Sequence, residues 1–202
     1  FLVISRLWLA QNLSRYSLMA VVTALTVPVS QIIVRNIITV HLGLDKAGVW
    51  QGMMRVSEGY LMIVNTALVT YFLPKLSKID TKEELFSEIK KGYIFILPFT
   101  LISCVVIYLL RFYIINLLYN KDFLEMESLF MWQLIGDFFK VASYIIGYLL
   151  LAKAVTKVYI ISEILFSLSL IILSYLLINR YGLEGSTMAF GINYFLYMIF
   201  IF

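Results

Sequence analysis

The long apolar stretches that follow one another along this chain most constrain its fold. Six of them reach or approach the ~20 residues that an α-helix needs to cross a bilayer. Hydrophobic residues make up 62% of the 202 residues and charged residues only 14%, whereas soluble domains average about 25% charged residues. A soluble core of this length has no room for so much apolar surface. The sequence therefore predicts an all-α polytopic membrane protein.

The predicted transmembrane helices share high hydropathy and few charges. They cover residues 17–41, 49–73, 93–110, 129–151, 159–177 and 186–202. Residues 1–16 are predicted to form an interfacial or linker segment. Residues 75–91 are predicted to form an amphipathic helix on the membrane surface, because apolar residues alternate there with many charges. The missing initiator Met and the apolar run at the end indicate a piece of a longer protein.

The distribution of basic residues predicts the orientation, because Lys and Arg favour the cytoplasmic ends of short loops. A cytoplasmic chain start places nine basic residues inside and four outside, so the start and the loop 75–91 are predicted to be cytoplasmic. The nine are Arg6, Arg15, Lys75, Lys78, Lys82, Lys90, Lys91, Lys153 and Lys157, and the four are Lys46, Arg111, Lys121 and Arg180.

Six ionisable residues fall inside the predicted spans. Near the bilayer centre such a group costs at least ~2.5–3.5 kcal/mol unless it faces partners or water. A wet, charged interior is therefore expected. The six are Arg35, Arg55, Lys140, Glu58, Asp137 and Glu163.

Polar residues repeat at helical spacing on three of the predicted helices, so each set lies on one stripe of its helix. Three such stripes indicate a shared polar cavity. The alternative is that the pairs Arg55–Glu58 and Asp137–Lys140 are salt bridges that hold the bundle together. The sets are Gln31 with Arg35, Gln51 with Arg55 and Glu58, and Gln133 with Asp137 and Lys140.

Pro28 falls in the middle of the first predicted span. Proline removes one backbone hydrogen bond, which Ser30, Gln31 or water can replace, so a kink or hinge is expected there.

The sequence carries no signature of a metal site, of ATP hydrolysis or of nucleic-acid binding. His41 and Cys104 are the only residues of their types and lie 63 positions apart, which is no metal-ligand pattern, so we predict no metal and no cofactor. No GxxxxGK[ST] sequence occurs, so this chain does not carry ATP hydrolysis. The cytoplasmic loops explain the positive charge, so no nucleic-acid partner is expected.

The chain resembles a known family over essentially its whole length, most specifically in two stretches. They are VWQGMMRVSEGYLMIVNTALVTYFLPKLSKI at 49–79 and LFMWQLIGDFFKVASYIIGYLLLAKA at 129–154, with the core WQLIGD. Together with IIVRNIITV at 32–40, they resemble the C-terminal half of the Wzx-type O-antigen and lipid III flippases, polysaccharide translocases of the multidrug/oligosaccharidyl-lipid/polysaccharide exporter superfamily. The resemblance implies that the chain is one six-helix lobe of a twelve-helix transporter.

This resemblance also implies a function. Such a transporter flips an undecaprenyl-pyrophosphate-linked oligosaccharide, an O-antigen unit or a lipid III-like molecule, from the cytoplasmic to the periplasmic leaflet of the bacterial inner membrane. It would work by alternating access, coupled to an ion gradient, and it would not be an enzyme. The implied partners are this lipid, membrane lipids, the missing N-terminal lobe, and the polysaccharide polymerase and chain-length regulator of lipopolysaccharide biosynthesis.

Arginine is the best candidate for holding a pyrophosphate, because guanidinium binds phosphate oxygens bidentately and stays charged. We therefore expect Arg35 and Arg55 to bind the pyrophosphate, with Lys140 as a third cation. Arg111 closes the outer end of the third span, where a role as an interfacial anchor is the simpler interpretation.

The remaining polar residues receive two interpretations. Three carboxylates are candidates for coupling lipid release to an ion gradient: Asp137, Glu58 and Glu163. Four amides are candidates for contacts with sugar hydroxyls or for bonds between helices: Gln31, Gln51, Gln133 and Asn193.

Two other functions remain open. A cation-coupled drug exporter of the same superfamily would share the architecture, although a cavity for organic cations should favour carboxylates over three cations. A polytopic membrane enzyme of glycan assembly is the other alternative, although the predicted outer loops are short and the single His41 lies at a helix end.

Overall fold

The computed structural model describes the backbone of residues 2–202 and the side chains of residues 14–202. The described chain is helical throughout and contains no strand between residues 2 and 202. Its elements are α1 (Leu2–Leu42), α2 (Leu44–Ala67), a π-helical turn (Leu68–Phe72), α3 (Leu73–Lys78), α4 (Lys82–Leu118), a 3-10 helix (Lys121–Leu129), α5 (Phe130–Ala152), α6 (Thr156–Tyr181) and α7 (Glu184–Ile201).

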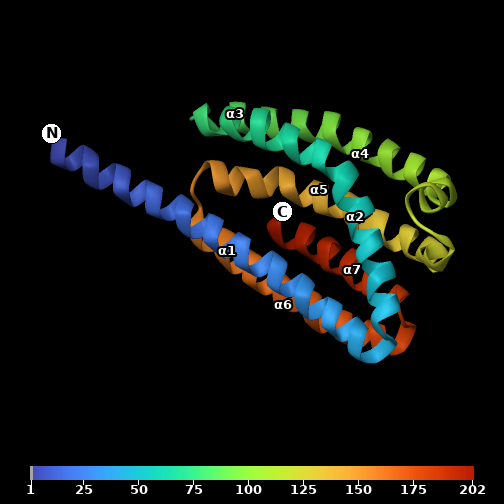
Figure 1. Ribbon diagram of the computed structural model, residues 1–202. Coiled ribbons are helices and arrows are strands. Elements are labelled where there is room, and N and C mark those ends of the chain that lie inside the picture. Colours follow the sequence, from blue (N-terminus) through green and yellow to red (C-terminus); the bar gives the residue numbers. More distant parts are fainter. Residues whose placement is uncertain (1) are drawn as a thin grey trace.

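Helix α5 lies in the middle of the bundle (Figure 1). Helices α3 and α4 contact it on one side, and α7 contacts it on the other. Helix α7 then packs against α6, and α6 packs against α1. Helix α2 joins the α1 end of this arrangement to the α4 end, so helices from both ends of the chain surround the same interior.

Five segments of the described chain are long and apolar enough to cross a membrane. They are Ser14–Leu42, Leu44–Lys78, Lys82–Leu118, Lys121–Ala152 and Thr156–Tyr181. The expected all-helical fold with several membrane-crossing helices is thereby confirmed. The sixth predicted span, 186–202, is also helical, as α7, but it is not among these five. Its first turns carry Glu184, Ser186 and Thr187, which lower its hydropathy.

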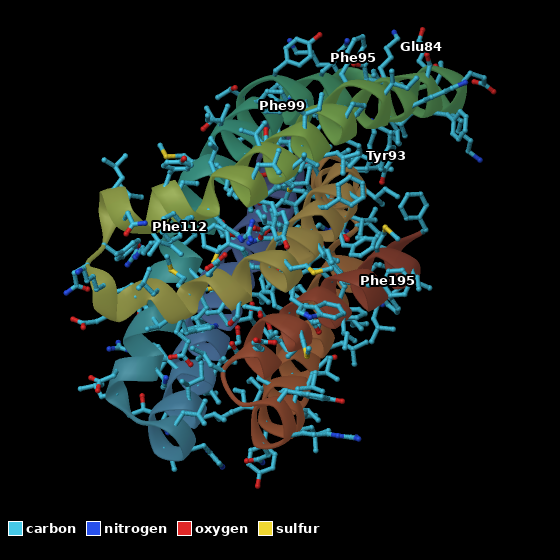
Figure 2. All side chains as sticks on the ribbon, turned by 90° about the vertical axis from the view of Figure 1, so that its right-hand side faces the viewer. Glu84, Tyr93, Phe95, Phe99, Phe112 and Phe195 are labelled. Atoms are coloured by element: carbon cyan, nitrogen blue, oxygen red, sulfur yellow. The ribbon has the colours of Figure 1, made fainter. Side chains whose placement is uncertain are left out.

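Helix α4 turns a row of aromatic rings away from the bundle. Phe95 and Phe99, four residues apart, are 73% and 52% exposed and lie on the upper, outer side of α4 in Figure 2. A contiguous apolar surface of this kind would be a liability in water. It suits contact with lipid chains.

Two predicted segment limits fall inside continuous helices of the structure. The backbone of α1 is helical from Leu2, so no boundary separates segment 1–16 from the span 17–41, although the side chains of residues 1–13 lie outside the described part. The predicted surface helix 75–91 is interrupted only at 79–81, after which α4 continues through the predicted third span to Leu118. Only Gly92 lies between its charged part and its apolar part, and one glycine costs about 1 kcal/mol in a helix without ending it. Helix α1 continues through Pro28, and the kink or hinge expected there stays a prediction.

A π-helical turn follows α2. Leu68 and Phe72 within it, with Val64 before it and Leu76 after it, are spaced four residues apart and are all at most 4% exposed. They belong to one apolar cluster that also contains Val141 and Ile145 of α5. The turn therefore keeps the apolar residues of α2 and α3 on one face, which packs against α5.

Candidate functional site

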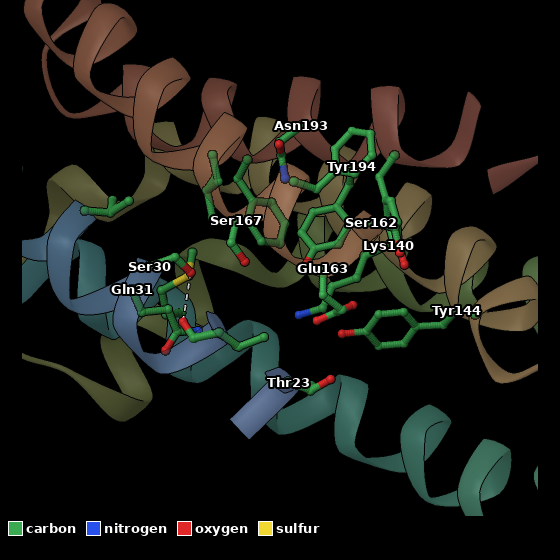
Figure 3. Close-up of a pocket in the computed structure, with 18 of the residues that line it drawn as sticks. Thr23, Ser30, Gln31, Lys140, Tyr144, Ser162, Glu163, Ser167, Asn193 and Tyr194 are labelled. Carbon is green, nitrogen blue, oxygen red and sulfur yellow. Dashed lines mark hydrogen bonds between the residues drawn. The ribbon is translucent and has the colours of Figure 1, made fainter. Parts of the chain in front are cut away.

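A cavity of about 360 Å³ lies between α1, α2, α5, α6 and α7. We call it the inner cavity (Figure 3). Polar side chains reach it from every one of these helices, although the residues around them are largely apolar or aromatic. They include Thr23 and Gln31 of α1, Asn65 of α2, Lys140 of α5, Glu163 of α6 and Asn193 of α7.

Lys140 reaches the inner cavity through a group of aromatic rings. Its Nζ lies 5.8, 5.6 and 5.5 Å from the ring centres of Tyr144, Phe190 and Tyr194. Aromatic faces attract cations at such distances. Among the described side chains Lys140 forms no salt bridge, so the alternative of an Asp137–Lys140 ion pair is not found.

Glu163 also lines the inner cavity. It comes from α6, and Figure 3 shows Glu163, Lys140 and Tyr144 converging on one part of the cavity. Within residues 14–202 Glu163, like Lys140, has no salt-bridge partner within 4 Å. The cavity thus contains a cationic and an anionic group that do not neutralise each other by direct contact.

A second, smaller pocket of about 170 Å³ brings Arg35 of α1 and Arg55 of α2 together. We call it the arginine pocket. Gln31, Gln51 and Glu58 also line it, so the first two predicted stripes meet there. Gln31, Trp50 and Met54 line both the arginine pocket and the inner cavity. The two spaces are therefore neighbours.

Both guanidinium groups remain accessible. Arg35 is exposed, and the Arg55 side chain is 69% exposed. Arg55 Nη1 lies 3.3 Å from Glu58 Oε2, which is the first of the two salt bridges considered from the sequence. An exposed pair of this kind contributes only ~0–1 kcal/mol, and it uses one of the five N–H donors of Arg55. Most of the donors of Arg55 stay available for an anion.

Asp137 is completely buried between α2 and α5 rather than in a pocket. Its carboxylate accepts hydrogen bonds from Ser57 at 2.8 and 2.7 Å, from Tyr60 at 2.7 Å and from Gln133 Nε2 at 3.2 Å. Gln133 is equally buried. These two predicted site residues join helices and do not line the inner cavity.

Arg111 lies apart from both spaces. Its Nη2 is 3.0 Å from Glu127 Oε1, and its guanidinium stacks 4.4 Å from the ring centre of Tyr108. It lines a different pocket beside the 3-10 helix.

Four side chains that contact the predicted site residues Asp137 and Lys140 were not identified from the sequence. Ser57 and Tyr60 bind Asp137, and Tyr144 and Tyr194 surround Lys140. Tyr144 follows Lys140 by four residues, a spacing that places both on one helix face and could have revealed it. Serines and tyrosines are common in apolar helices, so the others carried no distinct signal. No group of His, Cys, Asp and Glu in the described part of the chain is arranged to hold a metal ion.

The chain is similar to known proteins along nearly its whole length. It is 35% identical over 189 residues to the lipid III flippases of Escherichia coli (strain K12) and Shigella flexneri. The match covers 94% of this chain and 45% of each relative, so the chain spans about half the length of the curated relatives it matches. The resemblance predicted from the sequence is confirmed, and the coverage is consistent with a C-terminal half. No family model matches the chain, and no solved structure matches it.

Proposed function

From the homology of this chain to lipid III flippases over about half of their length, we propose that it forms one lobe of a transporter for a lipid-linked oligosaccharide. The substrate class is an undecaprenyl-pyrophosphate-linked glycan of the lipid III or O-antigen type. The transporter resides in the bacterial inner membrane and moves the head group from the cytoplasmic to the periplasmic leaflet. The reaction is transport and not catalysis.

The physical task of such a protein is to carry a charged, hydrated head group through hydrocarbon. An unpaired charge in an apolar medium costs far more than thermal energy provides. Fixed cations beside a hydrated space lower this barrier, while the lipid tail stays in the bilayer. The polar spaces between the apolar helices of this chain suit that task.

The observation that carries the proposal is that Arg35 and Arg55, from two different helices, line one pocket. Two guanidinium groups offer planar, paired donors that match phosphate oxygens. We assign the pyrophosphate to this arginine pocket. Gln51 would assist there, and Lys140 would act as a third cation from the neighbouring inner cavity.

The proposed movement is alternating access between this lobe and an N-terminal lobe, which together make twelve spanning helices. In this arrangement the chain start is cytoplasmic, and Pro28 softens α1. The polymerase and the chain-length regulator remain proposed partners. Gln133 is proposed to bond between helices, and Arg111 is proposed as an interfacial anchor.

Of the three candidate carboxylates, Glu163 is the one that we propose couples transport to the ion gradient. Glu163 faces the inner cavity without a salt bridge among the described residues. Glu58 is already paired with Arg55, and Asp137 already accepts hydrogen bonds from three donors, Ser57, Tyr60 and Gln133. A carboxylate must be reachable by the ion if it is to bind and release it.

The test replaces the arginines in the full-length protein. Arg35→Ala and Arg55→Ala should each abolish complementation of a flippase-deficient strain while membrane abundance stays normal. Arg55→Lys should retain part of the activity, because the charge remains but the bidentate geometry is lost. Arg180→Ala is the matched control, since Arg180 is an exposed cation at the end of α6 outside both spaces. Normal surface polysaccharide in both alanine variants would refute the assignment.

A further inference from the structure

A third pocket, of about 720 Å³, lies at the end of the bundle where α4 and α6 finish and α5 and α7 begin. We call it the rim pocket, and none of its described lining residues also lines the inner cavity or the arginine pocket. They include Tyr108 and Arg111 of α4, Glu125 and Glu127 of the 3-10 helix, Met131 of α5 and Glu184 of α7.

We propose that the rim pocket binds the head group of an aminophospholipid from the surrounding bilayer. The phosphate lies at Arg111, and the primary ammonium lies at Glu184. The inference needs only that the chain spans a membrane and does not depend on the transport activity proposed above.

The rim pocket lies where the apolar segments end. The segment that contains α6 ends at Tyr181, which lines the pocket, and the segment that contains α5 begins at Lys121, three residues before the lining residue Leu124. Lipid head groups lie at the ends of spanning helices. Tyrosine is enriched at that level, and both Tyr108 and Tyr181 line this pocket. The pocket therefore opens among head groups.

Arg111 supplies the group that binds the phosphate. Its Nη1 donates to the carbonyl oxygen of Tyr108 at 2.8 Å, and its Nη2 lies 3.0 Å from Glu127 Oε1. A guanidinium has five N–H donors, so these two contacts within the described residues leave several donors for another acceptor. Guanidinium matches the geometry of phosphate oxygens.

Glu184 supplies the group that binds the ammonium. It lies in the first turn of α7, is half-buried and has no salt bridge within residues 14–202. The other two carboxylates of the pocket are paired, Glu125 with Lys46 and Glu127 with Arg111. The dipole of α7 favours a carboxylate at Glu184 but leaves its oxygens free to accept hydrogen bonds. A primary ammonium offers three donors.

The charges select against an anionic lipid. The three carboxylates of the rim pocket face two cations, Arg111 and the Lys46 that pairs with Glu125, so one negative charge is in excess. A head group that carries only a phosphate would meet Glu184 without a cation to offer it. A head group with both a phosphate and an ammonium matches both charges.

The aromatic rings select against choline. A quaternary ammonium has no N–H donor and is usually held by a cage of aromatic faces. The Tyr108 ring already faces Arg111 at 4.4 Å, and the Tyr181 ring faces Arg180 at 5.5 Å. The pocket therefore favours a primary amine, which binds a carboxylate directly.

Apolar side chains of the rim pocket suit the rest of the lipid. Leu124 and Met131 line it and are 41% and 54% exposed. The glycerol backbone and the first carbons of the acyl chains can cover these side chains. This contact distinguishes a phospholipid from free phosphoethanolamine, which carries the same two charges without the chains.

The test measures lipid binding to the purified, delipidated full-length protein by native mass spectrometry. The three probes are dioleoyl phosphatidylethanolamine, phosphatidylcholine and phosphatidylglycerol. The wild-type protein should bind phosphatidylethanolamine at least fivefold more tightly than either of the others. Free phosphoethanolamine at the same concentration should not displace it.

Two substitutions at Glu184 test the ammonium contact. Glu184→Gln keeps the shape and removes the charge, and it should reduce the preference over phosphatidylcholine to less than twofold. Glu184→Asp keeps the charge and should retain most of the preference. Asp122→Asn is the matched control, because Asp122 is an exposed carboxylate of the neighbouring 3-10 helix that does not line the pocket. It should bind like the wild-type protein.

Arg111→Gln tests the phosphate contact. It should weaken the binding of phosphatidylethanolamine and phosphatidylcholine by a similar factor of about five, because both lipids carry the phosphate. If this variant fails to fold, the comparison of Glu184→Gln with Glu184→Asp still decides the proposal.

Three results would overturn the proposal. They are equal binding of the three lipids by the wild-type protein, tightest binding of phosphatidylglycerol, and an unchanged preference in Glu184→Gln. Displacement of the lipid by free phosphoethanolamine would show that the acyl chains contribute nothing and would overturn the assignment to a phospholipid. The arginine pocket is tested separately by complementation.

Discussion

Ser57 on α2 and Asp137 on α5 are eighty positions apart in the chain, yet the Ser57 hydroxyl lies 2.8 and 2.7 Å from the two carboxylate oxygens of Asp137. Tyr60 donates a third hydrogen bond from the next turn of α2. Because Ser57 lies between Arg55 and Glu58 in sequence, this contact also fixes the rotation of α2 that presents Arg55 to the arginine pocket.

We expect Asp137→Ala to lower the free energy of unfolding by about 2–4 kcal/mol, because it leaves the buried donors of Ser57, Tyr60 and Gln133 without their acceptor. Thermal unfolding of the full-length protein in detergent measures the change. Asp122→Ala, which removes an exposed carboxylate, should have little effect. A stable Asp137→Ala variant would mean that this contact does not hold α2 and α5 together.

Glu163→Gln should uncouple transport from the ion gradient, because an amide keeps the shape of the carboxylate but cannot bind and release a proton. In proteoliposomes, an imposed pH or sodium gradient should accelerate lipid flipping by the wild-type protein and not by this variant. Glu83→Gln, an exposed change near the start of α4, should respond like the wild-type protein. A Glu163→Gln variant with an undiminished response would assign coupling to another carboxylate.

Gly136→Ala should destabilise the contact between α5 and α7. An added Cβ would lie 2.4 Å from Phe190 Cδ1 and 3.0 Å from the Gly191 Cα, so one of the helices must move, at a cost of about 1–3 kcal/mol. Gly147→Ala on the same helix is the control. Its Cβ meets open space, and helix propensity predicts a gain of up to about 1 kcal/mol. Equal melting temperatures of the two variants would contradict the close approach.

Glu88→Ala should loosen the junction between α3 and α4. Glu88 is only 6% exposed, and its carboxylate lies 2.6 Å from Lys75 Nζ and 3.6 Å from Lys91 Nζ. Removing it leaves both cations without this partner, and we expect a loss of about 1–3 kcal/mol in thermal unfolding experiments. Glu84→Ala, an exposed neighbour, should be nearly neutral, and an equally small effect at Glu88 would refute the role of this ion pair.

The sequence predicted the helical class and the polar stripes, because apolar length and helical spacing are local properties. It predicted one cavity shared by three stripes, whereas only the first two stripes line the arginine pocket. Helix α2 folds back against α1, so the stripes that carry Arg35 and Arg55 face each other. Both are now seen beside Gln31 and Gln51, which the same spacing rule selected.

The third stripe shows what spacing alone leaves undetermined. Gln133, Asp137 and Lys140 lie within about 60° of one another around α5, but Lys140 lies about 10 Å further along the helix axis than Gln133. Asp137 and Gln133 contact Ser57 of α2, while Lys140 reaches the inner cavity. Only the positions of the neighbouring helices decide between these environments. Helix ends were also predicted wrongly where a single glycine separates charged from apolar turns, as Gly92 does in α4.

The π-helical turn at Leu68–Phe72 lets side chains four residues apart lie in one straight row along α2 and α3. In a regular helix, at about 100° per residue, Leu76 would point about 120° away from Val64. A turn that absorbs one extra residue cuts this offset to about 20°, so both side chains can join the same cluster. Deleting one residue here would restore an ordinary helix and preserve the alignment. Inserting one would swing Leu76 out of its cluster and carry the neighbouring charges of α3 around with it.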